Sequence, residues 1–330
     1  MAASTARRWL SISLKAAITI SLIWLVLRGV DWVEAVRHLR SLSVVGVALL
    51  LAILVLQGVV GAWRWTFTTS VFGTTLQFPK ALRLFFEGIF FNQALPSTIG
   101  GDAVRMYRCT QAGMPVSAAV NGVLLDRVGG VSGLLLLIAL SQPLAWQRIP
   151  GFGPRLAFLV VLASGFAGIV LLLSLASLPE RWQRWRLVSG IADLSAGARR
   201  LYRSPAIVAP VLGLSFVVHV LTVLAVYILA TDLGLPVTFW DCLVLIPLVF
   251  LVATIPVSIA GWGVREGAMV AALGVLGIST SGAVTLSVLF GLGLIAVGLI
   301  GGIAWLTSSE RRLINVIELE RTADPNVRPV

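Results

Sequence analysis

The sequence predicts an all-helical protein that crosses a membrane several times. Hydrophobic residues make up 58% of the 330 residues and charged residues only 12%, whereas soluble domains carry about 25% charged residues. Six apolar stretches reach the roughly 20 residues that a helix needs to span a bilayer. Two shorter apolar stretches each end at a proline that precedes a glycine-containing turn. These features predict a polytopic fold with six full spans and two re-entrant helical hairpins.

The six expected spans are separated by polar segments rich in arginine. The first span follows Arg7 and Arg8. It lacks a small-residue cleavage site, which favours a retained anchor over a cleaved signal peptide. The expected spans are residues 10–28, 42–62, 121–141, 155–177, 206–230 and 283–306.

The two shorter stretches, 81–95 and 241–255, are not long enough to cross the membrane. Each would form a helix of roughly 22 Å at 1.5 Å per residue. The first ends at Pro96 and the second at Pro256, and a moderately apolar stretch follows each turn. A helix that enters halfway and returns has this form, and such backbone is tolerated where it is buried in protein or lines a polar cavity. The returning stretches are 103–120 and 264–278.

Arginine clusters predict the orientation, because short cytoplasmic loops carry an excess of Arg and Lys. Six crossings place the N-terminus, the 179–205 loop and the C-terminal tail together in the cytoplasm. The first hairpin then enters from the cytoplasm and the second from the outer surface. The expected organisation is a cytoplasmic N-terminus, a first membrane repeat with its hairpin at about 81–120, an outer loop, a second membrane repeat with its hairpin at about 241–278, and a cytoplasmic tail. Their bounds are 1–9, 10–141, 142–154, 155–307 and 308–330.

Two ten-residue motifs repeat at an offset of 160 residues, "PSTIGGDAVR" (96–105) and "PVSIAGWGVR" (256–265). The unit around each motif contains three crossings. Because three is odd, the second copy is inverted relative to the first. Inverted repeats with interrupted helices recur in transporters, where half-helix N-termini face anionic substrates near the midplane. The alternative is a duplicated hairpin that serves packing alone, since small residues let helices approach closely.

Each motif ends in an arginine, Arg105 or Arg265, just past its glycine turn. A charge inside the membrane costs about 2.5–3.5 kcal/mol on insertion scales and tends to mark function. A guanidinium group binds phosphate bidentately, and a neighbouring helix N-terminus attracts the same anion. The alternative is that each arginine pairs with a nearby carboxylate, Asp102 or Glu266.

Further polar residues are expected near the hairpin tips. Asp126 and Arg127 open the 121–141 span and point about 100° apart, so one of them faces the interior unless both snorkel to the interface. Glu87 lies one turn after Arg83 and either pairs with it or needs another cation. The candidate substrate-binding residues are Arg105, Arg265, Arg127, Asp102, Asp126, Glu87, Glu266, Asn92, Thr98 and Ser258. The expected hairpin turns contain Pro96, Gly100, Gly101, Pro256, Gly261 and Gly263.

Several function classes are disfavoured by the sequence. It contains no G-x-x-x-x-G-K-[ST] and no H-E-x-x-H, and two histidines argue against a histidine-based active site. Cys109 and Cys242 give no disulfide pattern or metal-ligand spacing. The net charge of +11 fits basic cytoplasmic loops better than a nucleic-acid surface. We therefore expect no catalytic residue, no cofactor, no metal and no nucleic-acid partner.

The run "FFNQALPSTIGGDAVRMYR", followed by "VLLDRVGG", resembles the transmembrane region of lysylphosphatidylglycerol synthase. The family pattern contains Asn, Pro, a Gly-Gly-Asp-x-x-Arg turn and an acidic-Arg pair that opens the next helix. "PVSIAGWGVREG" is similar to the family's later Pro-x-x-x-x-Gly-x-Gly-x-Arg-Glu turn. The resemblance covers about residues 10–306. Two mild departures are Asp126, where glutamate is common, and Ser97, where many members have glycine.

The resemblance implies a flippase-like protein of the cytoplasmic (inner) membrane of a prokaryote, with anionic membrane lipids as its partners. In two-domain relatives this region moves aminoacylated phosphatidylglycerol between leaflets, while a cytoplasmic domain attaches the amino acid. The sequence shows no such domain, so aminoacyl transfer is not expected and a separate lipid-modifying enzyme is a candidate partner. Polyprenyl-phosphate-linked lipids are a second substrate class. The alternatives are a secondary transporter of a small soluble anion and a membrane enzyme that uses Asp102 or Asp126 on lipid phosphates.

Overall fold

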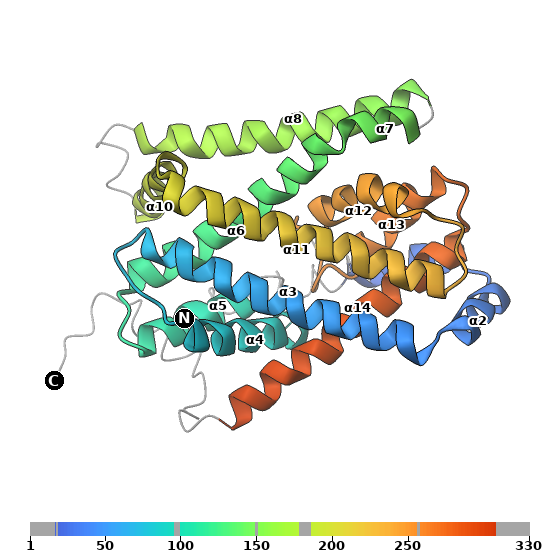
Figure 1. The fold of residues 1–330 in the computed structure, drawn as a ribbon, viewed down its shortest axis with the longest axis horizontal. Coiled ribbons are helices and arrows are strands. Elements are labelled where there is room, and N and C mark those ends of the chain that lie inside the picture. The colour runs from blue at the N-terminus through green and yellow to red at the C-terminus, as the bar shows by residue number, and fades with distance from the viewer. Residues whose placement is uncertain are drawn as a thin grey trace.

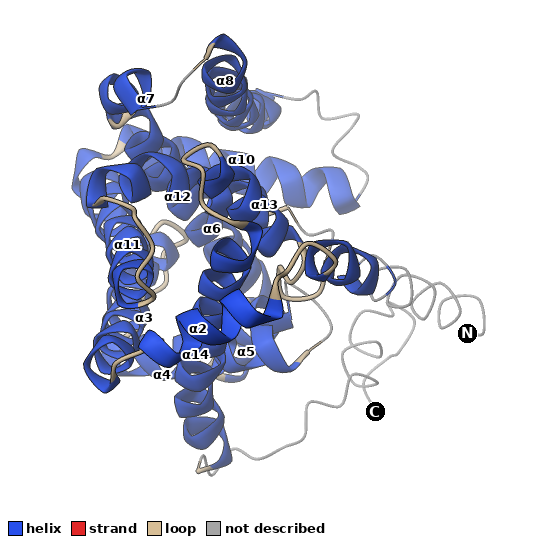
Figure 2. Cartoon of the chain, turned by 90° about the vertical axis from the view of Figure 1, so that its right-hand side faces the viewer, coloured by secondary structure: helices blue, strands red, loops and turns tan. Residues whose placement is uncertain are grey.

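The computed structural model describes residues 17, 19–95, 100–148, 151–177, 186–255 and 258–307. This part of the chain forms helices joined by loops and turns, with no strand (Figure 2). Of the expected first span, 10–28, residues 10–16 and 18 lie outside the described residues, and residues 19–27 are helical. Pro96, Thr98, Pro256 and the 308–330 tail also lie outside the described residues.

Four helices are long and apolar enough to cross a membrane. They agree with four of the six expected spans, although α3 continues beyond its expected end at residue 62. A fifth helix, α8 (Phe152–Ser174), coincides with most of the expected 155–177 span. Its apolar stretch, Phe158–Ser174, is just too short to count as a membrane span. The four long helices are α3 (Val44–Ser70), α6 (Val116–Leu140), α11 (Pro205–Asp232) and α14 (Thr280–Leu306).

Two pairs of shorter helices occupy the positions of the expected hairpins. The first pair is α4 (Phe78–Ala94) and α5 (Gly100–Gln111), and the second is α12 (Phe239–Ala253) and α13 (Val264–Gly274). The longest of them has 17 residues, fewer than the roughly 20 needed to cross a bilayer. Local sequence favours the start of the first helix in each pair. Helix α4 has a proline in its first turn, and α12 opens with a capping box in which Thr238 and Asp241 bond each other's backbone N–H.

The same order of elements occurs twice. Helices α3, α4, α5 and α6 form a long–short–short–long series, and α11, α12, α13 and α14 repeat it. In Figure 1, α4 and α5 occupy the left half of the molecule, α12 and α13 the right half, and α3 and α11 run side by side through both. The two hairpins therefore point toward the centre from opposite ends.

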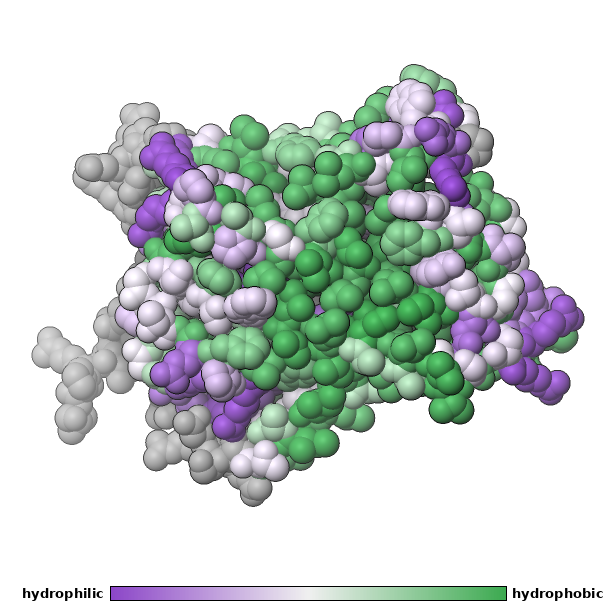
Figure 3. All heavy atoms as spheres, viewed as in Figure 1, coloured by the Kyte–Doolittle hydropathy of each residue, from purple (hydrophilic) through white to green (hydrophobic). Residues whose placement is uncertain are grey.

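The remaining helices lie around this duplicated body. Apolar side chains form a broad band across the middle of the face in Figure 3, between two polar ends. This distribution is what a bilayer requires of a protein that crosses it along the horizontal direction of the figure. The helices around the duplicated body are α2 (Trp32–Ser41), α7 (Gln142–Arg148), α8, η1 (Leu175–Ser177) and α10 (Arg186–Arg203).

Close backbone approach between α14 and α4 holds the first hairpin in place. At Gly301 an added Cβ would overlap the carbonyl oxygen of Phe86, and at Gly302 it would touch the Phe90 ring. Both glycines are buried. The small residues of α14 thus let the last long helix cross the first hairpin at backbone distance, as in many membrane helix contacts.

Candidate functional site

A buried network of charges joins α3, α5 and α6. Asp126 on α6 is 2% exposed and accepts a bond from Arg64 Nε at 2.8 Å and another from Arg105 Nη2 at 3.1 Å. Arg105 also lies 3.6 Å from Asp102, one turn earlier on α5. Its guanidinium carbon sits 3.9 Å from the centre of the Trp65 ring, a cation–π contact. Arg105 is therefore enclosed by two carboxylates and an aromatic face.

A second buried carboxylate, Glu87, lies in the first hairpin. It is fully buried, and two arginines bind it. Arg83 Nε is 3.2 Å away, one turn back on α4, and Arg108 Nε on α5 is 3.1 Å away. A buried carboxylate needs paired cations to offset its lost hydration. This pairing ties α4 to α5.

The second hairpin has a smaller charge cluster around Arg265. Arg265 donates to the adjacent Glu266 at 2.7 Å from Nη2 and to Ser287 Oγ on α14 at 3.1 Å from Nε. Ser287 Oγ also donates to Glu266 at 3.0 Å. The other carboxylate oxygen of Glu266 accepts the N–H of Gly263 at 2.5 Å. Glu266 therefore satisfies a backbone N–H at the start of α13 and holds Arg265 in one position.

Arg105 and Arg265 occupy equivalent places in the two halves. Each lies near the start of the second short helix and bonds to the long helix that follows, through Asp126 or Ser287. Each side chain also passes over a glycine. An added Cβ would meet the Arg105 stem at Gly88 and the Arg265 guanidinium at Gly291.

The two hairpin turns are held by different contacts. Across the first, Asn92 Oδ1 accepts the N–H of Gly101 at 2.9 Å, which joins the end of α4 to the start of α5. In the second, Gly261 and Gly263 have φ of 80° and 85°, a region that favours glycine. Ser258 Oγ is buried there and has no hydrogen-bond partner among the described residues.

A cavity of about 370 Å³ lies between the tips of the two hairpins. Arg127 on α6 and Arg265 on α13 both line it. Arg127 is bonded to Asp102, yet its side chain remains 41% exposed, against 5% for that of Arg265. Arg105 is not among the described residues that line the cavity. The lining residues are Asn92, Gln93, Arg127, Phe250, Ala253, Thr254, Ala260, Gly261, Arg265 and Leu294.

Positive charge is in excess in the charge clusters of the first half of the chain, and Arg127, which lines the cavity, belongs to one of them. In the first half of the chain, five guanidinium groups contact three carboxylates within the described ranges. Clefts lined by one sign of charge with low-dielectric walls concentrate oppositely charged ligands. The arginines are Arg64, Arg83, Arg105, Arg108 and Arg127, and the carboxylates are Glu87, Asp102 and Asp126.

Comparison with known protein families identifies the family of this chain. Residues 12–302 match the family described as Lysylphosphatidylglycerol synthase TM region. The chain belongs to this family. The resemblance read from the hairpin motifs is therefore confirmed. Family membership and the four long apolar helices together make the chain a multi-pass membrane protein related to lipid handling. A search of curated proteins gave no match.

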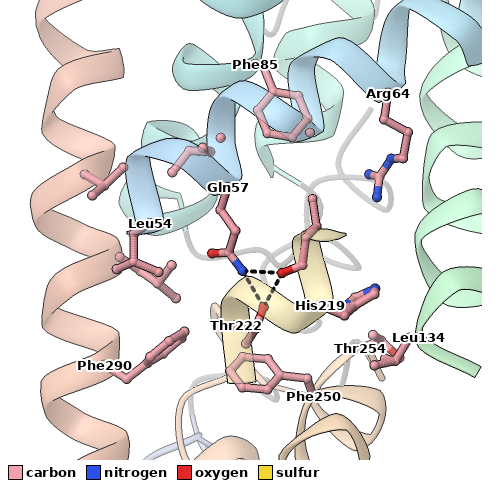
Figure 4. Close-up of a pocket in the computed structure, with 16 residues that line it drawn as sticks. Leu54, Gln57, Arg64, Phe85, Leu134, His219, Thr222, Phe250, Thr254 and Phe290 are labelled. Atoms are coloured by element: carbon pink, nitrogen blue, oxygen red, sulfur yellow. Dashed lines mark hydrogen bonds between the residues drawn. The ribbon is translucent and has the colours of Figure 1, made fainter. Parts of the chain in front are cut away.

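The chain also has a second cavity, of about 290 Å³, lined by residues of α3, α4, α6, α11, α12 and α14 (Figure 4). Its walls are largely apolar, with Gln57, Arg64 and His219 among the polar exceptions. Gln57 donates to Thr222, and His219 Nε2 lies 2.9 Å from the carbonyl oxygen of Gly130. The residues common to both cavities are Phe250, Thr254 and Leu294. The two spaces therefore adjoin.

The structure brings most of the candidate residues of this family member into two groups. Arg127, Arg265 and Asn92 line the cavity between the tips. The acidic candidates and Arg105 do not line this cavity. Each acidic candidate is instead bound to at least one arginine. Ser258 lies in the second turn without touching either group in a hydrogen bond. The acidic partners are Glu87, Asp102, Asp126 and Glu266.

Two arginines that complete the network were not among the candidates. Arg64 lies beyond the expected end of the second span, but α3 continues to Ser70 and carries it inside. Its position between two tryptophans in an apolar context was the available signal. Arg108 lies one turn after Arg105, and that i, i+3 spacing places both on one face of α5.

Proposed function

We propose that this protein moves an anionic lipid between the two leaflets of its membrane, and that Arg127 and Arg265 bind the lipid phosphate between the hairpin tips. The observation that carries the proposal is that both arginines line one cavity while belonging to opposite halves of the duplicated chain. Membership of a family related to lipid handling supports the same class of substrate.

The chemistry of the cavity suits a phosphate headgroup. Arg127 is bonded to Asp102 and its side chain is still partly exposed, so a phosphate in the cavity can reach its guanidinium group. Arg265 is fixed by Glu266 and Ser287. Its guanidinium group is therefore already in position before a phosphate binds. Asn92 and Thr254 add an amide and a hydroxyl group to the lining. Arginine forks of this kind recognise phosphate geometry as well as charge.

The hairpins provide the route in this proposal. The tip of α4 and α5 faces one half of the molecule and the tip of α12 and α13 faces the other (Figure 1). We propose that the first hairpin enters from the cytoplasm and the second from the outer surface of a prokaryotic inner membrane, with both termini in the cytoplasm. A phosphate passed from one tip to the other would change leaflets while its chains stay in the bilayer. The adjoining apolar cavity would give the lipid additional space during transfer.

The direct test is lipid translocation in proteoliposomes. The purified full chain is reconstituted with fluorescent phosphatidylglycerol, and a membrane-impermeant quencher reports the lipid that reaches the outer leaflet. We expect faster loss of protected fluorescence than in empty vesicles. Equal rates in protein-containing and empty vesicles, for phosphatidylglycerol and for a polyprenyl phosphate, would contradict the proposal.

Two other functions use the same residues and are separable by experiment. A transporter of a small soluble anion would carry radiolabelled phosphate or a water-soluble phosphate ester into the vesicles without moving lipid. An enzyme acting on lipid phosphates would alter the lipid species seen by mass spectrometry. Asp126 fits that role poorly, because its two oxygens accept bonds from Arg64 and Arg105, which opposes its protonation.

A further inference from the structure

Helix α2 exposes an apolar face that no other part of the described chain covers. Trp32 is 62% exposed, Val33 72%, Val36 45% and Leu39 43%. At about 100° per residue these side chains share one side of the helix. By the same spacing, Arg37 lies at the edge of this side and Arg40 lies within it, and both are exposed. The exposed surface of α2 therefore combines an apolar stripe with two cations.

The opposite side of α2 is fixed to the base of the second hairpin. His38 Nδ1 lies 2.8 Å from the carbonyl oxygen of Leu233, between α11 and α12. Glu34 accepts the hydroxyl proton of Ser279 at 2.7 Å, and the N–H of Asp31 donates to Ser281 Oγ at 2.7 Å. Leu233 precedes the hairpin and the two serines follow it. One side of α2 thus holds both connections of that hairpin.

The duplicated chain has a counterpart of this arrangement. Adding the 160-residue offset to 32–41 gives 192–201, which falls within α10. Helix α10 contacts Phe72, which lies between α3 and the first hairpin: Arg200 stacks over its ring, with the guanidinium carbon 5.4 Å from the ring centre. Each half therefore supplies a helix that touches the base of the other half's hairpin. Such repetition indicates that α2 is a built part of the architecture.

We propose that α2 lies in the plane of the membrane surface, with its apolar stripe in the outer part of the bilayer and Arg37 and Arg40 on anionic lipid phosphates. The apolar stripe is continuous with the start of α3, where Val44 is 86% and Val45 68% exposed. An amphipathic helix with exposed cations binds at the interface through buried apolar area and attraction to anionic lipids. The lipid surface thereby anchors the base of the second hairpin.

The test is the depth of a nitroxide label on α2 in vesicles. The label is placed at Val36→Cys in the full chain, because native Cys109 and Cys242 are buried. We measure its collision rates with O₂, which concentrates in the bilayer, and with a water-soluble nickel chelate. The measurement is made in two kinds of vesicle, one containing phosphatidylglycerol and one of phosphatidylcholine alone. The matched control is Ser41→Cys, an exposed position on another side of the same helix. We expect O₂ access to exceed nickel access at Val36→Cys and the reverse at Ser41→Cys.

The role of the cations is tested with Arg37→Gln and Arg40→Gln together. We expect this change to lower the O₂-to-nickel ratio at Val36→Cys in phosphatidylglycerol vesicles to the value found in phosphatidylcholine alone. Equal ratios in both vesicle types for the unaltered arginines would overturn the preference for anionic lipid. Nickel access at Val36→Cys as high as at Ser41→Cys, or shielding from both reagents as in a protein contact, would overturn the membrane placement. None of these readouts depends on lipid transport.

Discussion

Arg127 and Arg265 line one cavity, although they come from opposite halves of the duplicated chain. The first is on the long helix after the first hairpin and the second is on the returning helix of the second hairpin. Each has a carboxylate partner, Asp102 or Glu266. The cavity can therefore hold two guanidinium groups close together, and a phosphate placed between them would reduce their mutual repulsion.

Removing either cavity arginine should slow lipid transfer. We expect Arg127→Gln and Arg265→Gln each to reduce the rate of phosphatidylglycerol translocation by about 10- to 100-fold, as expected for loss of a charge-assisted hydrogen bond. Arg127→Lys should retain part of the rate, since it keeps the charge and loses the fork. The measurement is the proteoliposome assay with matched protein content.

The matched control is Arg28→Gln. Arg28 is exposed and stacks on Trp24, away from the cavity. Its removal should leave the rate unchanged. A loss at Arg28→Gln as large as at Arg127→Gln would show that general charge, and not the cavity, controls the rate.

Asp126→Ala should destabilise the fold. The change leaves Arg64 and Arg105 buried without their shared partner, and breaking a buried ion pair costs about 3–5 kcal/mol. Unfolding can be followed by reaction of a thiol-specific dye with Cys109 and Cys242, which are buried in the fold. Asp193→Ala, at an exposed carboxylate on α10, is the control. A loss below about 1 kcal/mol at Asp126→Ala would mean that the network does not hold α3, α5 and α6 together.

Gly301→Ala should separate α14 from the first hairpin. The new methyl group would overlap the carbonyl oxygen of Phe86, and the backbone has no rotamer with which to avoid it. Gly213→Ala is the matched helical control, because nothing lies within 4 Å of its Cβ position. We expect a lower thermal midpoint for Gly301→Ala and an unchanged or raised one for Gly213→Ala, where alanine favours the helix. Equal midpoints would contradict the close approach.

Much of the fold follows from features that the sequence displays directly. Apolar length predicts α6, α11 and α14, and the proline and glycine motifs predict both short hairpins because such residues interrupt helices. The repeated long–short–short–long order of the helices follows from the two motifs that lie 160 residues apart. Composition cannot predict the end of α3. An arginine such as Arg64 is expected in a loop, and its burial is explained only by the bond to Asp126 that the structure shows.

The partners of the arginines were less predictable than their presence. The motifs identify Arg105 and Arg265, but only packing decides that Arg105 lies against Asp126 and Trp65 while Arg127 reaches the cavity. Adjacent residues on a helix point about 100° apart, and a sequence does not say which of Asp126 and Arg127 faces inward. The answer depends on α3, which is distant in the chain.

Acidification should loosen α2 from the second hairpin. The hydrogen bond from Ser279 lowers the pKa of the Glu34 carboxyl below its ordinary value. A lowered pKa means that the contact contributes fully above the ordinary carboxyl pKa and is lost as the pH falls through the lowered one. We expect the thermal midpoint, followed by tryptophan fluorescence in detergent, to fall more steeply on acidification in the wild type than in Glu34→Gln. The difference should be small, because Glu34 is partly exposed. Parallel curves would show that the contact adds nothing.

The account depends most on two hairpins that enter from opposite membrane surfaces, and side-specific labelling of their bases tests this directly. Lys80→Cys reports the base of the first hairpin and Pro236→Cys the base of the second, both at exposed positions. In intact cells, an impermeant maleimide should label Pro236→Cys at once and Lys80→Cys only after lysis. Labelling of both positions from the same side would contradict the inverted hairpins and the transfer of a phosphate between them.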